Sequence, residues 1–308
     1  MTTLILGSKG FIGSNLCKYL KKKGYKFVSD QGKKKSNFLI YNNIKSLIDN
    51  SKPQIIVNCL GVVGGIQWGL NNKVKIFEEN NLLSINLLKS IKNKNVVLIN
   101  LLANCIYPFK YNKFNEKNIL NGPVHPSVYE YGMSRRLLFS ATKLYSEENL
   151  MKYINLIPSN VYGPGDHFDP HRSHALGGLI SKFKKASENN IDEIEIWGTG
   201  NPKRDWLFVN DLCEIIYKTI INRKKLYSKT FNVSSGDVIS IKKLAFTISK
   251  QFKYKGKLFF NKRYPDGDLI KSFDKTLFNK QLGFYKFTDI DRGINKTIKF
   301  LKTNEIKI

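Results

Sequence analysis

The sequence lacks any apolar run long enough to cross a bilayer, and no charged leader with an apolar region and cleavage site precedes Leu4–Leu6. We therefore expect a cytoplasmic protein without a secretory signal or a membrane partner. Cysteine is also scarce. The four cysteines are Cys17, Cys59, Cys105 and Cys213. Because they form no CxxC pair, we expect a reducing compartment and no structural zinc.

Histidine is scarce as well, with four residues in the chain. Three of them, His167, His171 and His174, surround one loop that also contains proline and aspartate. Their spacing is not that of metal ligands, so we expect no metal. A loop histidine beside a cleft can instead serve as a proton donor.

Acidic residues are outnumbered: the 308 residues include 24 Asp and Glu against 51 Lys and Arg, a net charge of +27. Such an excess attracts polyanions in principle. The lysines recur along the whole chain, however, and the runs Lys21–Lys23 and Lys33–Lys35 belong to no basic tail or aromatic-basic stripe. We interpret most of them as solvated surface that favours phosphorylated substrates, and we expect no specific nucleic-acid partner.

A glycine turn follows the first apolar segment. Thr3–Leu6 is predicted to be a strand and Asn15–Lys23 a helix that ends at Gly24, with a second strand over residues 26–29. Glycines let the backbone approach a pyrophosphate, and the free N–H groups of the helix N-terminus favour its charge. This order of elements predicts a dinucleotide site. The turn residues expected to bind the cofactor are Gly7, Lys9, Gly10, Phe11, Ile12 and Gly13.

The choice between NAD and NADP depends on the residues after the second strand. Asp30 stands where a carboxylate would bind the adenosine ribose, whereas Lys33–Lys35 would suit a 2′-phosphate. A short strand is predicted at Phe38–Tyr41, which would keep the basic run near the adenosine end. We expect NADP(H), with Lys33 among its ligands, and NAD(H) stays open.

Strands and helices continue to alternate, with a helix near Ile44–Asp49, a buried strand at Ile55–Cys59 and a long helix at Ile76–Lys92. Alternation of this kind implies parallel strands with right-handed crossovers, hence an α/β fold with a doubly wound parallel Rossmann sheet. Small residues after the strand at 55–59 leave room for a cofactor. The further cofactor residues expected here are Leu60, Gly61 and, on the long helix, Asn80.

The stretch Asn100–Pro108 follows the apolar run Val96–Ile99. It is predicted to be the carboxyl end of a buried parallel strand, where open α/β sheets place their chemistry. Strand alternation would put Ala103 and Cys105 on one face and Asn104 on the other, unless the strand has already unwound. Cys105 is therefore a candidate acid or base, and we expect the excess of cationic side chains to lower its thiol pKa from the usual value of about 8.5.

Tyr131 and Arg135 stand four residues apart at the start of a predicted helix, so we expect them on one helix face, one turn apart. A phenol ionises near pH 10, and a neighbouring cation favours its anion, which would ease proton exchange with a carbonyl oxygen. The alternative is a core tyrosine capped by a surface arginine. The last third, with segments Glu193–Trp197, a turn at Arg204–Trp206 and a helix at Ile241–Phe252, is interpreted as a smaller α/β domain.

Several motifs occur in a characteristic order: the glycine turn, residues 63–66, Cys105–Pro108, Tyr131, residues 158–164, residues 197–204 and residues 265–274. In this order the chain resembles GDP-L-fucose synthase, of the extended short-chain dehydrogenase/reductase superfamily. The Cys-Ile-Tyr-Pro and Trp-Gly-x-Gly-x-Pro-x-Arg segments are specific to that branch. Such enzymes act on a GDP-4-keto-6-deoxy-hexose, epimerise C3 and C5, reduce C4 with NADPH and are usually dimers.

The resemblance implies that Tyr131 gives a proton to the C4 oxygen and that Cys105 and His174 are the epimerisation base and acid. The sequence departs from the family at two positions: the catalytic serine is Ala103 here, and the catalytic lysine is Arg135. Asn104 would take the role of the missing serine only if the strand twists. The residues implied for the nucleotide sugar are Asn160, Lys182, Trp197, Arg204 and Lys271.

The resemblance also divides the chain. Residues 1–165, with about 203–232, would form the NADP-binding Rossmann domain, and about 166–202 with 233–308 the smaller C-terminal domain that binds the nucleotide sugar.

From these observations we expect a homodimer that reduces the C4 ketone of a GDP-linked 4-keto hexose or heptose with NADPH. Epimerisation at C3 and C5 would accompany this reduction or be absent. The product would be a precursor of surface polysaccharide, including capsule, or of glycoconjugates. One alternative is a 3,5-epimerase whose redox half has decayed, since Cys105 and His174 are intact. Another is a non-catalytic dinucleotide sensor or nucleic-acid-associated protein, against which Trp197 and Arg204 count.

Overall fold

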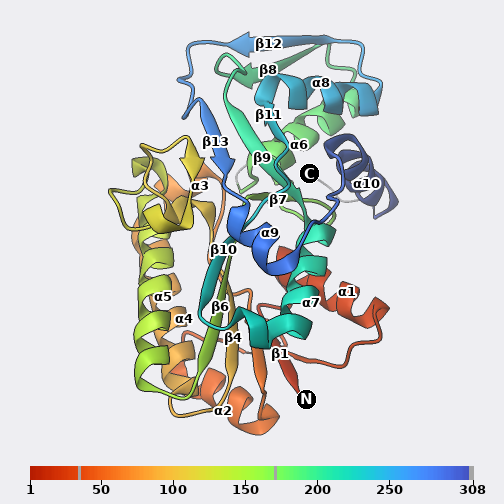
Figure 1. Ribbon diagram of the computed structural model, residues 1–308. Coiled ribbons are helices and arrows are strands. Elements are labelled where there is room, and N and C mark those ends of the chain that lie inside the picture. The colour runs from red at the N-terminus through yellow and green to blue at the C-terminus, as the bar shows by residue number, and fades with distance from the viewer. Residues whose placement is uncertain (34–35, 170–171, 305–308) are drawn as a thin grey trace.

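The structure is a computed structural model that describes residues 1–33, 36–169 and 172–304. A six-stranded parallel sheet forms the centre of the larger part of the molecule (Figure 1). Its order is β10-β6-β4-β3-β1-β2. The strands are β1 (Thr3–Leu6), β2 (Val28–Ser29), β3 (Ile55–Asn58), β4 (Val97–Leu101), β6 (Lys152–Pro158) and β10 (Lys229–Val233). The predicted doubly wound α/β fold is confirmed.

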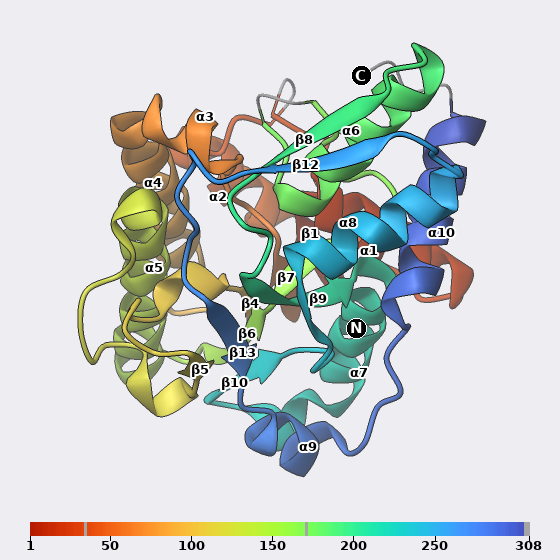
Figure 2. The ribbon, with the colours of Figure 1, turned by 90° about the horizontal axis from the view of Figure 1, so that it is seen from above.

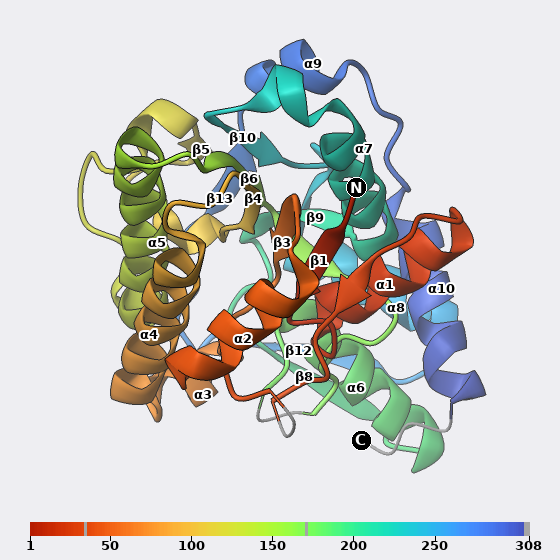
Figure 3. The same cartoon turned by 90° about the horizontal axis from the view of Figure 1, so that it is seen from below.

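Helices cover both faces of this sheet (Figure 3). On one face lie α2 (Tyr41–Ser51), α4 (Lys73–Ile91) and α5 (Tyr129–Glu148); on the other lie α1 (Phe11–Lys22) and α7 (Val209–Leu226). Alternate residues of each strand serve the two layers: Ile5 packs in the core under α1 and α7, and Leu4 and Leu6 pack in the core under α2 and α4. Burial on both faces explains why the strands are continuous apolar runs.

The smaller part lies above the carboxyl edge of the large sheet (Figure 1). Its five-stranded sheet has the order β11-β9-β13-β5, and β7 pairs with β9. A further parallel pair, β8 with β12, crosses the top (Figure 2). The strands are β5 (Lys113–Phe114), β7 (Asn160–Tyr162), β8 (Glu193–Trp197), β9 (Lys203–Phe208), β11 (Val238–Ser240), β12 (Lys257–Asn261) and β13 (Ile270–Phe273).

The remaining helices are α3 (Ile66–Leu70), α6 (Ala175–Glu188), α8 (Ile241–Phe252), α9 (Thr276–Leu282) and α10 (Ile290–Thr303). Side chains of α6, α8 and α10 form a second core with β8 and β9. The domain bounds drawn from the sequence stay a prediction; β9, assigned there to the Rossmann domain, pairs in the smaller sheet. No helix in the described part of the chain is long and apolar enough to cross a membrane.

Two local predictions were wrong. The expected strand at Phe38–Tyr41 is a turn that leads into α2, because the buried Asn86 of α4 donates from Nδ2 to the carbonyl oxygens of Phe38 at 3.0 Å and Leu39 at 3.1 Å. These carbonyls are therefore not available to a strand ladder. The expected turn at residues 204–206 lies inside β9, whose Trp206 pairs with β7.

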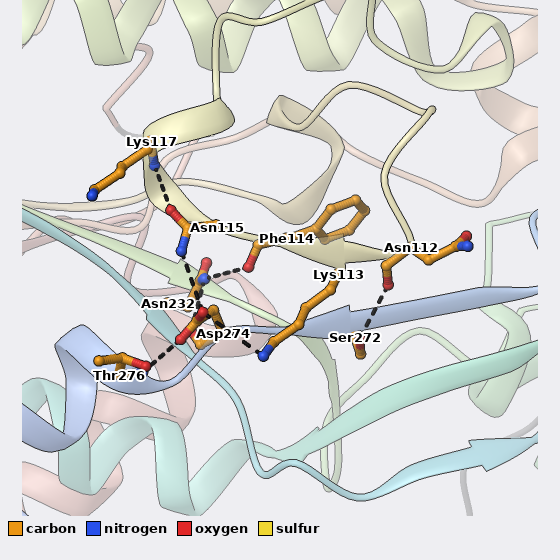
Figure 4. A network of polar contacts seen from close by, with 9 residues as sticks. All are labelled: Asn112, Lys113, Phe114, Asn115, Lys117, Asn232, Ser272, Asp274 and Thr276. Atoms are coloured by element: carbon orange, nitrogen blue, oxygen red, sulfur yellow. Dashed lines mark hydrogen bonds and ion pairs between the residues drawn. The ribbon is translucent and has the colours of Figure 1, made fainter.

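Asn232, on β10, joins the smaller sheet to the large one (Figure 4). Its Nδ2 donates to the carbonyl oxygens of Phe114 at 3.1 Å and Asp274 at 3.0 Å, so it binds the ends of β5 and β13 together. The carboxylate of Asp274 accepts from the Thr276 N–H at 2.9 Å. Tyr107 donates to Asn232 Oδ1 at 2.6 Å. The segment that contains Cys105 is thereby fixed to the carboxyl end of the large sheet.

Candidate active site

The glycine turn has the backbone geometry that its sequence predicts. Gly7 has a φ of +79°, and the Gly10 N–H donates to the Gly7 carbonyl at 3.0 Å. Gly13, in the first turn of α1, lies so close that an added Cβ would be 2.1 Å from the Gly7 oxygen. Gly10 gives α1 no side-chain cap. The N–H groups of the helix start can therefore receive a phosphate.

Asp30 is bonded to this turn rather than directed toward a ligand. Its Oδ2 accepts from the N–H groups of Gly7 and Ser8, and its Oδ1 accepts from the N–H of Gly32 at 2.8 Å. The Ser8 hydroxyl lies 3.1 Å from the same Oδ1. A buried carboxylate with four donors stabilises the turn and has little capacity left for a ribose hydroxyl.

Lys33 lies at the edge of the same loop. Its Nζ forms a 3.1 Å ion pair with Glu79, which precedes Asn80 on α4, and two thirds of its side chain is exposed. Lys9 packs its aliphatic stem near Gly32. Both predicted cofactor lysines thus border the loop after β2, whereas Lys34 and Lys35 lie outside the described residues.

Tyr131 and Arg135 share one face of α5, as predicted, with the guanidinium 4.8 Å from the centre of the phenol ring. Arg135 donates from Nη2 to Asn80 Oδ1 at 2.6 Å and from Nη1 to the Leu60 carbonyl at 3.4 Å. A Cβ on Gly61 would lie 3.5 Å from the Tyr131 hydroxyl oxygen and 3.7 Å from Arg135 Nη2. The fold therefore gathers five predicted residues at the carboxyl end of β3.

Arg135 is not the surface cap of the alternative reading, since only 2% of it is exposed. It forms no ion pair among the described residues, and its buried Nε has no hydrogen-bond partner there. Burial raises the pKa of Tyr131, and the positive charge of Arg135 opposes that rise only in part. The predicted effect of the cation is therefore present but outweighed by burial, and the phenol keeps its proton at neutral pH.

Cys105 lies beyond the strand, because β4 ends at Leu101 and residues 104–106 form a 3-10 turn. The strand alternation expected for Ala103 and Cys105 therefore does not apply. Burial raises the pKa of the Cys105 thiol to about 12, with the positive charges of Arg135 and Lys271 opposing the rise. The expected lowering of the thiol pKa is thus wrong for the protein alone.

Asn104 lies in this turn, whereas His174 lies at the start of α6. Asn104 donates to Asn160 Oδ1 at 3.3 Å. His174 is the N-cap residue of α6, and the loop before it contacts the small residues that follow β3, where the Gly65 N–H donates to the Arg172 carbonyl at 2.9 Å. Desolvation of the ring, with a contribution from His167, lowers the pKa of His174, although the residue as a whole is exposed. His171, also noted in the sequence, lies outside the described residues.

Trp197 and Lys182 form a small surface cluster with Tyr264. Trp197 is 56% exposed and stacks on Tyr264 with ring centres 4.5 Å apart, while Lys182 Nζ lies 5.3 Å from the indole. Lys182 also donates to the Glu195 carbonyl at 2.7 Å. Tyr264 was not found by sequence reasoning, although an exposed aromatic just before Pro265-Asp266-Gly267 could have indicated it.

Arg204 and Lys271 meet at Asp268. Arg204 Nη1 donates to the Asp268 carbonyl at 2.6 Å, and Lys271 forms a 2.8 Å ion pair with its carboxylate. β9 and β13 pair in parallel with Lys271 opposite Arg204. The two cations are therefore held side by side, and Lys271 is also close enough to influence the Cys105 thiol.

Comparison with known proteins agrees with this geometry. The model of the NAD dependent epimerase/dehydratase family matches residues 3–234. The chain belongs to that family. The GDP-L-colitose synthase of Yersinia pseudotuberculosis is 32% identical over 306 residues, with 97% of each chain covered. The GDP-L-fucose synthase of Dictyostelium discoideum is 30% identical, with 98% of this chain and 96% of the other covered. The predicted resemblance to GDP-L-fucose synthase is confirmed.

Solved structures share the fold of this family member. A GDP-L-fucose synthetase from Naegleria fowleri bound to NADP has a TM-score of 0.89 at 23% identity, with 99% and 94% of the two chains covered. A GDP-mannoheptose C4 reductase from Campylobacter jejuni with NADP bound has a TM-score of 0.86 at 23% identity, with 98% of each covered. The prediction of an NAD(P)-dependent enzyme is confirmed through the family.

Two positions distinguish this member of the epimerase/dehydratase family from the pattern that its sequence resembles. Ala103 has no hydroxyl, and the amide of Asn104 is engaged by Asn160. Arg135 donates from both terminal nitrogens of its guanidinium, from Nη2 to Asn80 and from Nη1 to the Leu60 carbonyl. A lysine ammonium has no planar fork, so the arginine suits this pair of acceptors.

Proposed function

We propose that this protein reduces the C4 ketone of a GDP-linked 4-keto sugar with NADPH. The observation that carries the proposal is the half-buried Tyr131, whose hydroxyl lies beside Arg135 and beside Gly61, in the loop that abuts a glycine turn shaped for a dinucleotide. The two full-length relatives named GDP-L-colitose synthase and GDP-L-fucose synthase support a GDP-sugar substrate. NADPH, when bound, supplies the hydride.

Tyr131 would supply the proton. Because burial raises its pKa, the phenol keeps its proton until the ketone oxygen gains negative charge, and the proton then moves from the phenol to that oxygen. Arg135 would stabilise the phenolate that results, since its cation lies over the ring and has no carboxylate partner among the described residues. The unpartnered Nε of Arg135 fits a site that takes a further polar group.

The substrate would extend from this site across the smaller domain. Trp197 and Lys182 offer an aromatic face and a cation, and Arg204 and Lys271 offer two cations for a diphosphate. Asn160 would lie near the sugar, next to Asn104. Both hexose and heptose substrates fit this proposal. A nucleotide sugar is the activated form that glycosyltransferases use, which is why we assign the reaction to cytoplasmic synthesis of surface-polysaccharide precursors.

The proposal is tested by following NADPH absorbance with a GDP-4-keto-6-deoxy-hexose, the corresponding 4-keto heptose and a UDP-linked 4-keto hexose. We expect oxidation with at least one GDP sugar and little with the UDP sugar. A protein that binds NADPH but oxidises it with none of these sugars would contradict the proposal and favour the non-catalytic alternative.

The preference for NADPH rests on two observations: the carboxylate of Asp30 is already bonded to the turn, and Lys33 borders the loop after β2. We expect Lys33→Ala to weaken NADPH binding roughly fivefold and to leave NADH binding nearly unchanged, as for one exposed ion pair. Glu79→Gln frees Lys33 and is the matched variant, expected to strengthen NADPH binding. Fluorescence titration measures both. Equal losses for the two cofactors in Lys33→Ala would refute the role of Lys33.

A homodimer is proposed on the exposed face of α4. Val74, Phe77, Leu82 and Ile85 are exposed apolar residues on one side of this helix, which lies beside α5 at the edge of the molecule (Figure 1). We expect the 35.4 kDa chain to sediment as a dimer, and Phe77→Glu with Ile85→Glu to give monomers. Wild-type protein that sediments as a single chain would contradict the proposal.

We propose epimerisation at C3 or C5 as a second activity, because the positive charges of Arg135 and Lys271 favour the Cys105 thiolate against the effect of burial. The alternative of an epimerase that has lost its reductase activity is not supported by the tyrosine site. Tyr131 and Arg135 form an ordered pair there, as a working reductase requires.

A further inference from the structure

A row of buried amides crosses the large sheet. Asn58, Asn100 and Asn155 are register partners on β3, β4 and β6, and Thr230 continues the row on β10. Asn58 Nδ2 donates to Asn100 Oδ1 at 3.0 Å, and Asn100 Nδ2 donates to Asn155 Oδ1 at 3.0 Å. Asn155 Nδ2 donates to Thr230 Oγ1 at 3.2 Å. We call these four residues the amide ladder.

Amide side chains are unusual at buried positions of strands that are covered on both faces. The three asparagines are at most 3% exposed, in strands whose other residues are almost all apolar because both faces of the sheet are covered. Buried amides destabilise a fold unless they are bonded, and here every amide donates in the same direction along the row. Such a chain of bonds fixes the relative register of four strands.

The ladder is bonded to the helix that carries the candidate proton donor. The second N–H of Asn100 Nδ2 donates to Thr142 Oγ1 at 3.2 Å. Thr142 lies on α5, seven residues beyond Arg135 and eleven beyond Tyr131, so the three side chains point to the same side of that helix. Thr142 is fully buried and donates to the Leu138 carbonyl at 2.6 Å.

The first residue of the ladder is bonded to the loop that faces Tyr131. Asn58 Oδ1 accepts from the Leu60 N–H at 3.1 Å. The carbonyl of Leu60 then accepts from Arg135, and Gly61 abuts the Tyr131 hydroxyl. One continuous set of side-chain bonds therefore holds both the helix that carries Tyr131 and Arg135 and the loop against which they lie.

We propose that the amide ladder, with Thr142, is a positioning network that sets the distance between the Tyr131–Arg135 pair and the Leu60–Gly61 loop. The catalytic part of this proposal rests on the proposed reduction; the positioning part does not. Proton transfer depends steeply on the separation of donor and acceptor, so a loosened ladder lowers kcat while substrate still binds through residues of the smaller domain.

Thr142→Val tests the network, because it removes one hydroxyl and keeps the shape. We expect kcat for reduction to fall about tenfold, with KM for the GDP sugar changed less than about twofold. Thr142→Ser restores the hydroxyl and is expected to keep kcat near the wild-type value. Thr219→Val is the matched control: Thr219 is also fully buried and donates to a carbonyl four residues before it, at 2.8 Å, but on α7. It is expected to lower Tm without lowering kcat.

Amide hydrogen exchange gives a readout that does not need turnover. In Thr142→Val, peptides over residues 59–65 and 130–137 are expected to exchange about tenfold faster, and in Thr219→Val they are expected to be unchanged. Wild-type exchange in Thr142→Val, or an equal loss of kcat in Thr219→Val, would overturn the positioning network. If wild-type protein reduces no GDP sugar, the proposed function fails, whereas the exchange data still decide whether the ladder holds the loop.

Discussion

Replacing Tyr131 with phenylalanine is expected to lower kcat for C4 reduction by about a thousandfold, because the hydroxyl is the proton donor to the developing alkoxide. The ring, and with it the contact to the Arg135 guanidinium at 4.8 Å, stays in place. NADPH affinity is therefore expected to change little. Single-turnover kinetics with a GDP-4-keto sugar separate the two quantities.

Tyr129→Phe is the matched control for that experiment, since Tyr129 lies on the same helix, two residues earlier, and is 53% exposed. Its variant is expected to reduce the ketone at the wild-type rate. Full activity in Tyr131→Phe, on a substrate that the wild type turns over rapidly, would show that another group protonates the oxygen.

Replacing Cys105 with serine is expected to abolish exchange of the hydrogens at C3 and C5 in heavy water. The C4 ketone acidifies these hydrogens, so a thiolate can remove one as a proton, leave an enolate, and allow a proton or deuteron to return to the same carbon. His174 is neutral near pH 7 because its pKa is lowered, so it would have to gain a proton before donating one. Hydride transfer to a ketone that is already epimerised is expected to continue.

The pKa of about 12 makes this exchange strongly dependent on pH. At pH 7 such a thiol is ionised in only about one molecule in a hundred thousand, and the fraction rises about tenfold for each pH unit up to the pKa. We therefore expect deuterium uptake in the absence of NADPH to rise about tenfold per unit between pH 7 and pH 9. Mass spectra of the recovered sugar measure it.

Cys17→Ser, on α1, is the control and should leave deuterium uptake unchanged. Uptake that persists in Cys105→Ser would assign the base to another residue. If wild-type protein incorporates no deuterium while it reduces the ketone rapidly, the protein is a C4 reductase and another enzyme performs the epimerisation.

Local patterns in the sequence were sufficient for the dinucleotide turn and for the tyrosine helix. The glycine spacing at Gly7, Gly10 and Gly13 encodes a backbone path, and the four-residue spacing of Tyr131 and Arg135 encodes a shared helix face. Both are properties of neighbouring residues, so they could be predicted without knowledge of the rest of the fold.

Features that depend on distant partners could not be predicted in this way. Asp30 was read as a candidate ribose ligand, but its oxygens are occupied by the glycine turn more than twenty residues away. Phe38–Tyr41 was predicted to be a strand, but Asn86 of α4 donates hydrogen bonds to the carbonyl oxygens at the start of this segment. The thiol pKa of Cys105 was expected to fall near cationic residues, yet burial by the packed domains outweighs those charges.

The central claim is that hydride passes from NADPH to C4 of a GDP-linked 4-keto sugar. It is tested most directly with NADPH that carries deuterium at the transferred position of the nicotinamide, followed by NMR and mass spectrometry of the product. The account predicts one deuterium per product molecule, bound at C4, and about a thousandfold slower formation of that product with Tyr131→Phe. Product without deuterium at C4, or no product although NADPH and the GDP sugar both bind, would contradict it.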